Sequence, residues 1–478
     1  MIGLFTAAQV RAAEQQVLAG SRPDALMLRA ATGLATTCLR LLGRAHGLRV
    51  VLLVGSGDNG GDALFAGALL AGRGAAVRAV LLDPARAHAA GLTALRRAGG
   101  RVAGPADDGL DRADLVLDGI VGIGGTGPLR PAAVELVHRA VAGPGLLVAV
   151  DVPSGVVADT GEVPGEAFPA QHTVTFGAVQ TGLVVGAGRA HAGTVHLVDI
   201  GLGDALPAPE AGQLTDADVA VHLEQPGADD DKYSRGVVGV LAGSATYPGA
   251  GVLCTGAALR TRPGLVRYAG TAAEGVRASW PEAIVTSGRP ADAGRVQAWV
   301  AGPGMGTDDD ARSVLAEVLA TDLPVVVDAD GLTLVARHRE LVGDRSAPTV
   351  LTPHDREFAR LFGEVGTDRV AAARRGAADL GCTVLLKGEA TVVADADGTT
   401  FVNGTGTPWL ATAGTGDVLA GILGAVLATG VPAAEAAAVA AHLHGRAGQL
   451  AAEHGPLIAG DLVRRLPETV ARLRGSAG

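Results

Sequence analysis

Short apolar runs and alanine-rich stretches alternate along most of this chain, and that alternation restricts the fold more than any single residue does. Apolar runs of strand length separated by helix-length segments are typical of βαβ units, whose strands form a parallel sheet with helices on both faces. The alternation begins near residue 49, stops over a Gly- and Pro-rich segment at residues 203–212, and then resumes. We therefore expect an α/β protein with two three-layer domains, residues 1–210 and 211–478.

The apolar runs locate the expected strands. In the first domain they cover residues 49–54, 77–82, 114–117 and 146–150, with a helix over residues 62–72. In the second domain they cover residues 237–241, 296–300, 324–327, 349–351 and 383–386. Two further runs, 391–394 and 400–402, flank a turn of Asp and Gly residues and predict a hairpin.

Composition and charge exclude several classes of protein. A chain of 478 residues is too long for one ordinary core, and 48% apolar with 18% charged residues suits buried parallel sheets. A net charge of -10 argues against non-specific nucleic-acid binding. No apolar run reaches the ~18–20 residues of a membrane span, and the N-terminus lacks the features of a signal peptide.

Cysteine usage indicates the compartment. Cys38, Cys254 and Cys382 are far apart and odd in number, which fits a reduced environment without a disulfide framework or a zinc pattern. We therefore expect a cytoplasmic protein. We further expect it to act on small molecules, as a homo-oligomer, without nucleic-acid or membrane partners.

A glycine-rich loop, residues 55–62, follows the first expected strand and precedes a helix. It matches the G-x-G-x-x-G pattern of dinucleotide-binding proteins, and Asp83 stands near the offset of a ribose ligand. An NAD-dependent dehydrogenase is therefore one alternative. Asp58 and Asp62 would repel a pyrophosphate, however, and they suit a loop that binds a cation or the polar groups of a substrate.

Four polar residues stand at the ends of expected strands in the first half: Asn59, Asp118, Asp151 and Ser154. Because ligands of an open parallel sheet bind at the carboxyl ends of its strands, these side chains can converge. Amide, carboxylate and hydroxyl oxygens suit a hard cation, and with few formal charges potassium is as plausible as magnesium. Asp151 is the candidate general acid–base group.

These motifs resemble the NAD(P)H-hydrate epimerase family over residues 1–205. The resemblance rests on residues 58–62, on the loop after Asp118 and on residues 151–155; Asp58 stands where the family usually has Asn, and Ala63 where it usually has Gly. It implies a Rossmann-like domain in which Asn59, Asp118 and Ser154 hold potassium. It implies substrate binding by Asp58, Asn59, Gly60, Gly61, Asp62, Gly122, Ile123, Gly124, Gly125, Thr126, Gly127, Pro128 and Asp151.

In the second half, the segment Ala411-Thr412-Ala413-Gly414-Thr415-Gly416-Asp417 leads into an apolar helical run. A helix N-terminus offers unpaired N–H groups and a partial positive charge, and glycines let these groups close around an anion such as phosphate. Asp417 would lie beside that anion, where a carboxylate is useful as a base. A Gly-rich helix cap is the simpler alternative, but a carboxylate behind an anion site would be repelled unless it has a function.

Lysine is rare in this chain, because only Lys232 and Lys387 are found among 39 basic residues. A lysine kept in an arginine-biased sequence indicates a need for a compact point charge. Lys387 and Gly388 follow an expected strand, and with residues 414–417 they predict the charge, anion site and base of phosphoryl transfer. The G-x-x-x-x-G-K-[ST] motif does not occur, so the chain is no P-loop enzyme.

We interpret three histidines of this half as structural residues. His354 follows a strand and precedes a helix, which is typical of a capping or packing residue. His442 and His444 lie two residues apart in an alanine-rich helix and face different sides of it.

The motif order is similar to the ribokinase-like superfamily, and more closely to the ADP-dependent NAD(P)H-hydrate dehydratase family, over residues 213–470. The resemblance rests on Lys232, Gly302-Pro303-Gly304, Leu351 to His354, Lys387-Gly388 and residues 411–417; Asp231 stands where the family often has His. It implies nucleotide binding by Lys387, Gly388, Glu389, Ala390, Thr391, Gly414, Thr415 and Gly416. It implies contacts to the hydrated substrate by Ala250, Gly304, His354 and Asp417.

Both resemblances imply one substrate, a reduced nicotinamide nucleotide that carries a hydroxyl at C6. The first domain would interconvert its R and S epimers with Asp151 as catalytic residue. The second would dehydrate the S epimer with Asp417 as base, after phosphoryl transfer from ADP with magnesium. Two alternatives stay open: a ribokinase-like small-molecule kinase fused to a Rossmann-like domain, and a non-catalytic nucleotide-binding protein. The choices between ADP and ATP and between NADH and NADPH hydrate also stay open.

Overall fold

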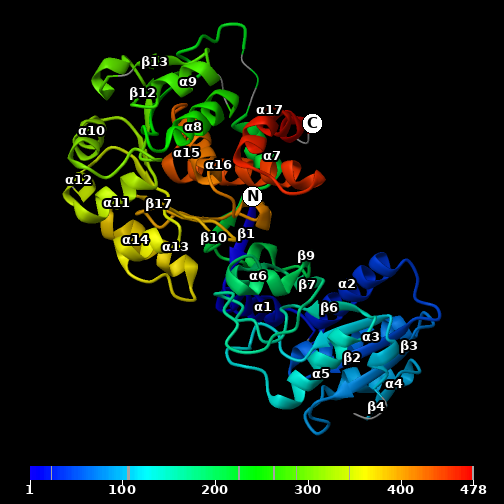
Figure 1. The fold of residues 1–478 in the computed structure, drawn as a ribbon. Coiled ribbons are helices and arrows are strands. Elements are labelled where there is room, and N and C mark those ends of the chain that lie inside the picture. Colours follow the sequence, from blue (N-terminus) through cyan, green and yellow to red (C-terminus); the bar gives the residue numbers. More distant parts are fainter. Residues whose placement is uncertain are drawn as a thin grey trace. The chain divides into compact units, whose positions relative to one another are not determined.

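The computed structural model describes residues 1–22, 24–104, 108–223, 225, 227–261, 264–286, 288–343 and 345–475. The chain divides into two compact units, one of residues 3–211 and one of residues 1–2 with 212–478. In both units helices surround a mainly parallel sheet (Figure 1). The predicted α/β class is therefore confirmed for each unit.

Seven strands of the first unit form a parallel sheet in the order β4-β3-β2-β5-β6-β7-β9. They are β2 (Arg49–Val54), β3 (Ala76–Leu81), β4 (Arg101–Ala103), β5 (Leu115–Gly119), β6 (Leu146–Val150), β7 (His172–Phe176) and β9 (Thr194–Val198). The chain runs from β2 outward to β4 and then returns to β5 on the other side of β2. That reversal opens a crevice at the carboxyl ends of β2 and β5, where open sheets bind ligands.

Helices cover both faces of this sheet. They are α1 (Ala7–Ala19), α2 (Ala25–Leu42), α3 (Asp58–Ala71), α4 (Ala89–Arg97), α5 (Pro131–Ala142) and α6 (Gly186–Ala192). One buried apolar cluster packs the four helices α1, α2, α3 and α4 against one face of the sheet. A second cluster packs α5 against the other face. The strands β1 (Ile2–Phe5) and β8 (Val179–Gln180) pair in parallel outside this seven-stranded sheet.

Helix α3 begins earlier than the sequence predicts. The expected helix covered residues 62–72, whereas α3 extends from Asp58 to Ala71. Its first turn lies so close to the end of β2 that a Cβ atom on Gly60 would approach the Gly55 carbonyl oxygen to 2.5 Å. Gly60 and Gly61 of the motif therefore belong to the helix itself, Gly57 is its N-cap, and Asp58 and Asn59 lie in its first turn.

Helix α2 corrects the expectation that no segment reaches membrane-spanning length. It has 18 residues with a mean hydropathy of 1.3, which is long and apolar enough by composition alone. Its face of Leu26, Ala30, Leu34 and Cys38 is buried in the core of the first unit. Of its 18-residue window, 39% is buried.

The second unit has a sheet in which ten consecutive strands follow the order β13-β12-β11-β14-β15-β16-β17-β18-β19-β10. They are β10 (Ala211–Gln213), β11 (Val237–Leu241), β12 (Leu265–Ala269), β13 (Ile284–Thr286), β14 (Ala298–Ala301), β15 (Val325–Val327), β16 (Thr349–Leu351), β17 (Thr383–Leu386), β18 (Val392–Ala394) and β19 (Thr400–Val402). The predicted hairpin is confirmed, since β17, β18 and β19 pair antiparallel. The other pairs in this order whose register is known are parallel.

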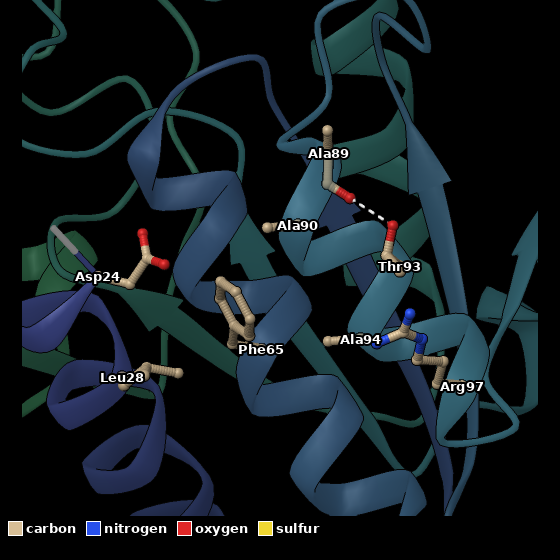
Figure 2. A pocket seen from close by; sticks show the side chains of 8 residues that line it. All are labelled: Asp24, Leu28, Phe65, Ala89, Ala90, Thr93, Ala94 and Arg97. Carbon is tan, nitrogen blue, oxygen red and sulfur yellow. Dashed lines mark hydrogen bonds between the residues drawn. The ribbon is translucent and has the colours of Figure 1, made fainter.

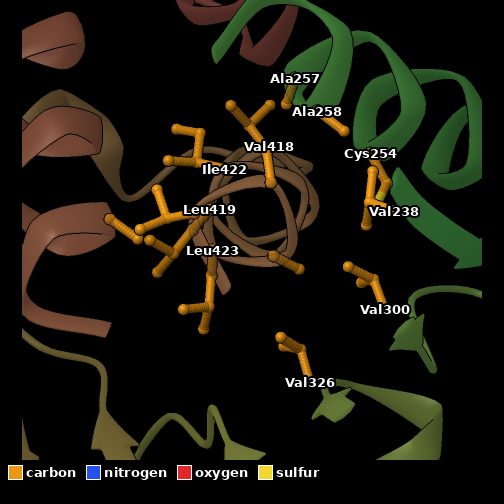
Figure 3. Packing of buried hydrophobic residues seen from close by; sticks show 14 of the residues in the cluster. Val238, Cys254, Ala257, Ala258, Val300, Val326, Val418, Leu419, Ile422 and Leu423 are labelled. Carbon is orange, nitrogen blue, oxygen red and sulfur yellow. The ribbon is translucent and has the colours of Figure 1, made fainter. Parts of the chain in front are cut away.

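The helices of this unit are α7 (Asp216–Val221), α8 (Pro248–Thr261), α9 (Ala273–Ser279), α10 (Asp309–Leu319), α11 (Asp330–Arg337), α12 (Glu340–Gly343), α13 (Asp355–Phe362), α14 (Arg369–Leu380), α15 (Thr415–Leu427), α16 (Ala433–Ala451) and α17 (Ala459–Gly475). Helix α15 is the central one: Val418, Ile422 and their neighbours pack against α8 and the strands (Figure 3). A Cβ atom on Gly424 would lie 2.1 Å from Val300. The close approach holds α15 directly against β14.

Candidate active sites

The first candidate site lies where the chain reverses between β2 and β5. Ser154 donates from Oγ to Asp118 Oδ1 over 2.7 Å, and its N–H donates to Asp118 Oδ2 over 2.8 Å. The N–H of Val121 donates to Ser154 Oγ over 2.9 Å. Asp118 and Ser154 are fully buried, and burial raises the pKa of Asp118 to about 6 despite these hydrogen bonds. The predicted pairing of these two strand ends is present.

Asn59, near Asp151, has an unsatisfied side chain. Both its amide nitrogen and its amide oxygen are buried without a hydrogen-bond partner, as is Oδ1 of Asp62. A Cβ atom on Gly122 would lie 3.1 Å from Asn59 Oδ1 and 3.1 Å from Asp151 Oδ2, so both side chains line the same space. Buried polar atoms are nearly always paired, and orphaned ones point to a ligand.

Asp151 is held in a strained conformation. Its φ is 68°, and Ala329 is the only other non-glycine residue with positive φ in the described chain. The N–H of Ile123 donates to its Oδ2 over 3.3 Å, and Thr175 Oγ1 donates to its Oδ1 over 3.2 Å. Burial raises the pKa of Asp151 to about 6 against these hydrogen bonds. Backbone strain of this kind is concentrated at functional sites.

The predicted substrate loop, residues 122–128, follows β5. The structure brings Gly122 and Ile123 against Asp151, and Gly125 closes a turn by donating its N–H to the Gly122 carbonyl. Arg11 of α1 donates to the Ile123 carbonyl over 3.1 Å. Contacts of Gly124, Thr126, Gly127 and Pro128 with a substrate stay predictions.

In the second unit, Lys387 lies at the centre of a charged network. Its Nζ donates to Asp328 Oδ1 over 2.8 Å and lies 3.8 Å from Glu357 Oε2. Thr352 Oγ1 donates to the same Asp328 oxygen over 2.8 Å. Burial alone would lower the pKa of Lys387, but the carboxylates of Asp328 and Glu357 outweigh it and raise the pKa. Lys387 is therefore a fixed positive charge.

The glycine turn before α15 faces this charge. Gly414 caps the helix with a φ of 87°. A Cβ atom on Gly416 would lie 3.6 Å from Lys387 Nζ and 3.9 Å from Asp328 Oδ2. The N-terminus of α15, with its partial positive charge, and the lysine thus converge, as an anion site requires. A side chain at Gly416 would project into that space.

Asp417 is in the same first turn. A Cβ atom on Gly414 would lie 3.9 Å from its Oδ2. Burial is the largest cause that raises the pKa of Asp417 to about 7; Asp328 adds to it and Lys387 opposes it. A carboxylate with a pKa close to neutrality is suited to general-base catalysis.

Two loops with predicted substrate contacts meet beside this turn. A Cβ atom on Gly304 would lie 2.9 Å from Ala250 and 3.1 Å from Tyr247, so the loop after β14 contacts the start of α8. The side chain of Tyr247 is 61% exposed. Further along, Gly306 donates its N–H to Asp330 Oδ2 over 3.0 Å.

His354 is the N-cap of α13, as the sequence indicates. Its Nδ1 accepts hydrogen bonds from the N–H groups of Arg356 and Glu357 at 3.1 and 3.3 Å, and Glu357 Oε2 accepts from the His354 N–H. Glu357 therefore links His354 to Lys387. A substrate contact by His354 stays a prediction.

The predicted nucleotide segment, residues 387–391, forms the turn between β17 and β18. Arg369 donates to the Lys387 carbonyl over 2.8 Å and would lie 2.5 Å from a Cβ atom on Gly388. Ala390 is buried, while Glu389 is exposed. Lys232, the other lysine, is exposed with its Nζ 5.3 Å from the ring centroid of Tyr233.

The two histidines of α16 are both buried and hydrogen-bonded. His442 Nε2 lies 2.6 Å from Asp216 Oδ1. His444 Nε2 lies 2.9 Å from the Thr415 carbonyl, and burial lowers the pKa of His444 to about 4. A neutral His444 donating from Nε2 supports the turn that carries Asp417, a link that helix position alone did not reveal.

Sequence reasoning missed several residues of both sites. Asp328, Glu357 and Arg369 surround Lys387 from three different elements. Of these three, only Asp328 had a signal in the sequence, because it stands at the end of an expected strand. Arg11 of α1, which donates to the Ile123 carbonyl, was also missed, because α1 precedes the βαβ pattern.

A surface pocket of about 460 Å³ lies apart from these sites, between α2, α3 and α4 (Figure 2). Phe65 and Leu28 form its apolar part, with Asp24 and Arg97 at its edges. Thr93 Oγ1 donates to the Ala89 carbonyl there. The residues that line it include none of the predicted site residues.

Comparisons with known proteins identify the family of this chain. The family model for NAD(P)H-hydrate dehydratase matches residues 238–470, and the model for the YjeF-related protein N-terminus matches residues 23–182. The bifunctional NAD(P)H-hydrate repair enzyme of Mycobacterium leprae is 52% identical over 476 residues, 98% of each chain. Its counterpart in Mycobacterium tuberculosis is 52% identical over 434 residues, 90% of each chain.

Solved structures resemble the second unit. A ribokinase-like superfamily protein of Enterococcus faecalis is 28% identical with a TM-score of 0.51, covering 55% of this chain and 96% of that one. An ADP/ATP-dependent NAD(P)H-hydrate dehydratase of Bacillus subtilis, co-crystallized with ATP/Mg2+, is 28% identical with a TM-score of 0.49, covering 54% and 97%. Given the identity along nearly the full length, the chain belongs to the family of bifunctional NAD(P)H-hydrate repair enzymes.

Proposed function

We propose that the first unit interconverts the R and S epimers of C6-hydrated NADH or NADPH, and that the second dehydrates the S epimer with ADP as phosphoryl donor. The observation that supports this most is the position of Asp417 in the glycine turn that faces Lys387. A base beside a phosphate site is what phosphorylation of a hydroxyl requires.

In the dehydratase, Asp417 takes the proton of the C6 hydroxyl. The hydroxyl oxygen then attacks the terminal phosphorus of ADP, and AMP leaves. The N–H groups of residues 414–416 and the Lys387 ammonium stabilise the charge on the phosphoryl group. The C6–O bond then breaks, phosphate leaves with the bonding electrons, and loss of a proton from C5 restores the ring double bond. The products are NAD(P)H, AMP and phosphate. Ala250, Gly304 and His354 bind the substrate, and residues 387–391 bind the nucleotide.

In the epimerase, residues 58–62 and 122–128 bind the hydrate and Asp151 acts as an acid–base group. The unpartnered amide of Asn59 and the Asp118–Ser154 pair fit potassium, since these are hard oxygen donors with little formal charge. Bound potassium supplies a fixed positive charge that offsets the acids of α3.

Magnesium would be carried mainly by the nucleotide. The described residues contain no group of three or more His, Cys, Asp or Glu side chains that could hold a metal. Magnesium commonly reaches such sites through substrate phosphates and few carboxylates.

We also propose a cytoplasmic homo-oligomer with a domain boundary at residues 210 and 211. All three cysteines are free thiols in buried positions, as a reducing compartment allows. Light scattering of the purified protein measures the oligomeric state.

The proposed activity is tested by mixing the purified protein with hydrated NADH or NADPH and following the absorbance of the reduced ring. We expect recovery with ADP and no recovery without a nucleotide. Parallel reactions with ATP measure the nucleotide preference. Accumulation of a stable phosphorylated product would indicate a small-molecule kinase. Binding of the nucleotide without turnover would indicate a non-catalytic protein.

Potassium should support both epimerisation and the stability of the first unit. Asp118→Ala should lose activity and potassium dependence together, because the buried carboxylate organises Ser154 as well as the ion. The rate of C6 interconversion by NMR and the melting temperature are compared in potassium and in tetramethylammonium. A ligand at 100 times its Kd stabilises by about 2.7 kcal/mol. Equal rates and equal melting temperatures in both salts would contradict the potassium site.

Lys387→Arg should weaken nucleotide use although the charge is kept. The ammonium fits between Asp328, Glu357 and the glycine turn, and a planar guanidinium is too broad for that space. We expect a higher KM for ADP and a lower kcat in steady-state kinetics. The control is the reverse exchange, Arg356→Lys, at an exposed position of α13, and it should change neither constant. Unchanged constants would mean that the lysine is interchangeable.

A further inference from the structure

Helix α1 places two charged side chains at the epimerase site. The helix is anchored by a Thr6–Gln9 capping box and by the Ala7 N–H, which donates to Asp159 Oδ1 over 2.6 Å. Asp159 follows the Ser154 loop, so the start of α1 is fixed to the segment that carries the site. Arg11 and Glu14 are three residues apart and therefore share one face of the helix.

That face is directed at the loop whose Ile123 contacts Asp151. Arg11 Nη2 donates to the Ile123 carbonyl over 3.1 Å, and the N–H of Ile123 donates to Asp151 Oδ2 over 3.3 Å. A Cβ atom on Gly124 would lie 3.2 Å from Arg11 Nη2. One residue, Ile123, thus joins α1 to the strained aspartate, and Glu14 follows one turn later on the same side.

The surroundings of Glu14 are unusually acidic. Burial is the largest cause that raises the pKa of Glu14 to about 7, followed by the charges of Asp151 and Asp58, while Arg11 opposes the shift. Asp62 of α3 belongs to the same cluster, since its pKa is raised by burial and by the charges of Asp151, Asp58 and Glu14. The charged groups that face Glu14 are therefore Arg11, Asp58, Asp62 and Asp151.

We propose that Glu14 is the second catalytic carboxyl of the epimerase and works as an acid–base pair with Asp151 across C6 of the hydrated ring. The inference rests on the proposed epimerase function. It explains why a helix outside the sheet carries a half-buried acid toward the site, where a salt bridge or a neutral residue would be cheaper to desolvate.

The chemistry of C6 calls for two such groups. This carbon bears the hydroxyl and is bonded to the ring nitrogen N1. One carboxylic acid donates its proton to the hydroxyl, the C6–O bond breaks with its electrons on oxygen, and water leaves as the N1 lone pair forms the N1=C6 iminium.

Water then adds to the opposite face. Its oxygen forms the new C6–O bond, the N1=C6 pair returns to nitrogen, and the second carboxylate takes the proton. The net change is inversion at C6, and the two carboxyls have exchanged protonation states, so the next turnover runs in the other direction. Inverting glycosidases use two separated carboxyls on an oxocarbenium-like centre in the same manner.

The test compares Glu14→Gln and Glu14→Asp with Glu135→Gln, which makes the same charge change on the exposed side of α5. NMR follows the conversion of R to S hydrate in the full chain, giving kcat and KM separately. We expect Glu14→Gln to lower kcat by about 10²–10⁴-fold with little change in KM. Glu14→Asp should keep part of the rate, and Glu135→Gln all of it.

Labelled water gives a second readout that a merely structural residue would not move. In H₂¹⁸O the wild-type chain should place one solvent oxygen at C6 for each inversion, and Glu14→Gln should slow label uptake and inversion equally. Wild-type kcat in Glu14→Gln, a change in KM alone, or inversion without label would each overturn the pair. If Glu14→Gln is unfolded by circular dichroism, the rate of Glu14→Asp decides. An inactive wild-type chain would instead refute the epimerase function itself.

Discussion

Replacing Asp417 with asparagine should lower the rate of dehydration by about 10²–10⁴-fold, the usual cost of removing a general base. Asparagine keeps the size of the side chain and its place in the first turn of α15, so the anion site stays formed. The loss should appear in kcat, measured with S hydrate and saturating ADP. Epimerisation should be unchanged, because its candidate residues belong to the other unit.

Asp309→Asn is the matched control, since Asp309 also lies in the first turn of a helix but is 97% exposed. The pH dependence adds a second check. Because the pKa of Asp417 is raised to about 7, its carboxyl is protonated below that pH and cannot accept the substrate proton. Dehydration should therefore rise with pH through about 7, and a near-normal rate in Asp417→Asn would refute the assignment.

Replacing Asp151 with asparagine should abolish epimerisation by a similar factor of about 10²–10⁴. Asparagine is the informative choice because Asp151 has a φ of 68°, and Asn is among the few residues that adopt this region readily. Alanine would mix the loss of the carboxylate with backbone strain. The R hydrate should persist, while the S hydrate is still dehydrated in the presence of ADP.

Asp111→Asn, at a side chain that is 79% exposed in the same unit, is its control. Thermal unfolding of both variants shows whether the first unit is intact. R-to-S conversion at the wild-type rate in a folded Asp151→Asn variant would mean that this carboxylate only shapes the loop through Ile123 and Thr175.

The sequence predicted what local pattern determines. Apolar periodicity located β2, β5, β6 and most strands of the second unit, and glycine spacing located the turn at Gly414. The convergence of Asp118 with Ser154 followed from the rule that parallel strands end at one edge.

Contacts between distant segments were beyond that reasoning. Asp328 and Lys387 are 59 residues apart, and nothing in either loop indicates which strands are neighbours. The start of α3 at Asp58 depends on the close packing of Gly60 against Gly55. Arg11 reaches the Ile123 carbonyl because α1 is anchored to a loop about 150 residues away in sequence, a tertiary effect that propensity does not encode.

Two sites that act in sequence on one molecule are the central claim, and a racemic C6 hydrate tests it most directly. The hydrate is incubated with ADP and wild-type, Asp151→Asn or Asp417→Asn protein, and both epimers and NAD(P)H are followed by NMR. The wild type should convert all of the hydrate. Asp151→Asn should convert the S share and leave R, and Asp417→Asn should equilibrate R and S without forming NAD(P)H. Complete conversion of R by Asp151→Asn, beyond its spontaneous epimerisation, or loss of both activities in one folded variant would contradict the account.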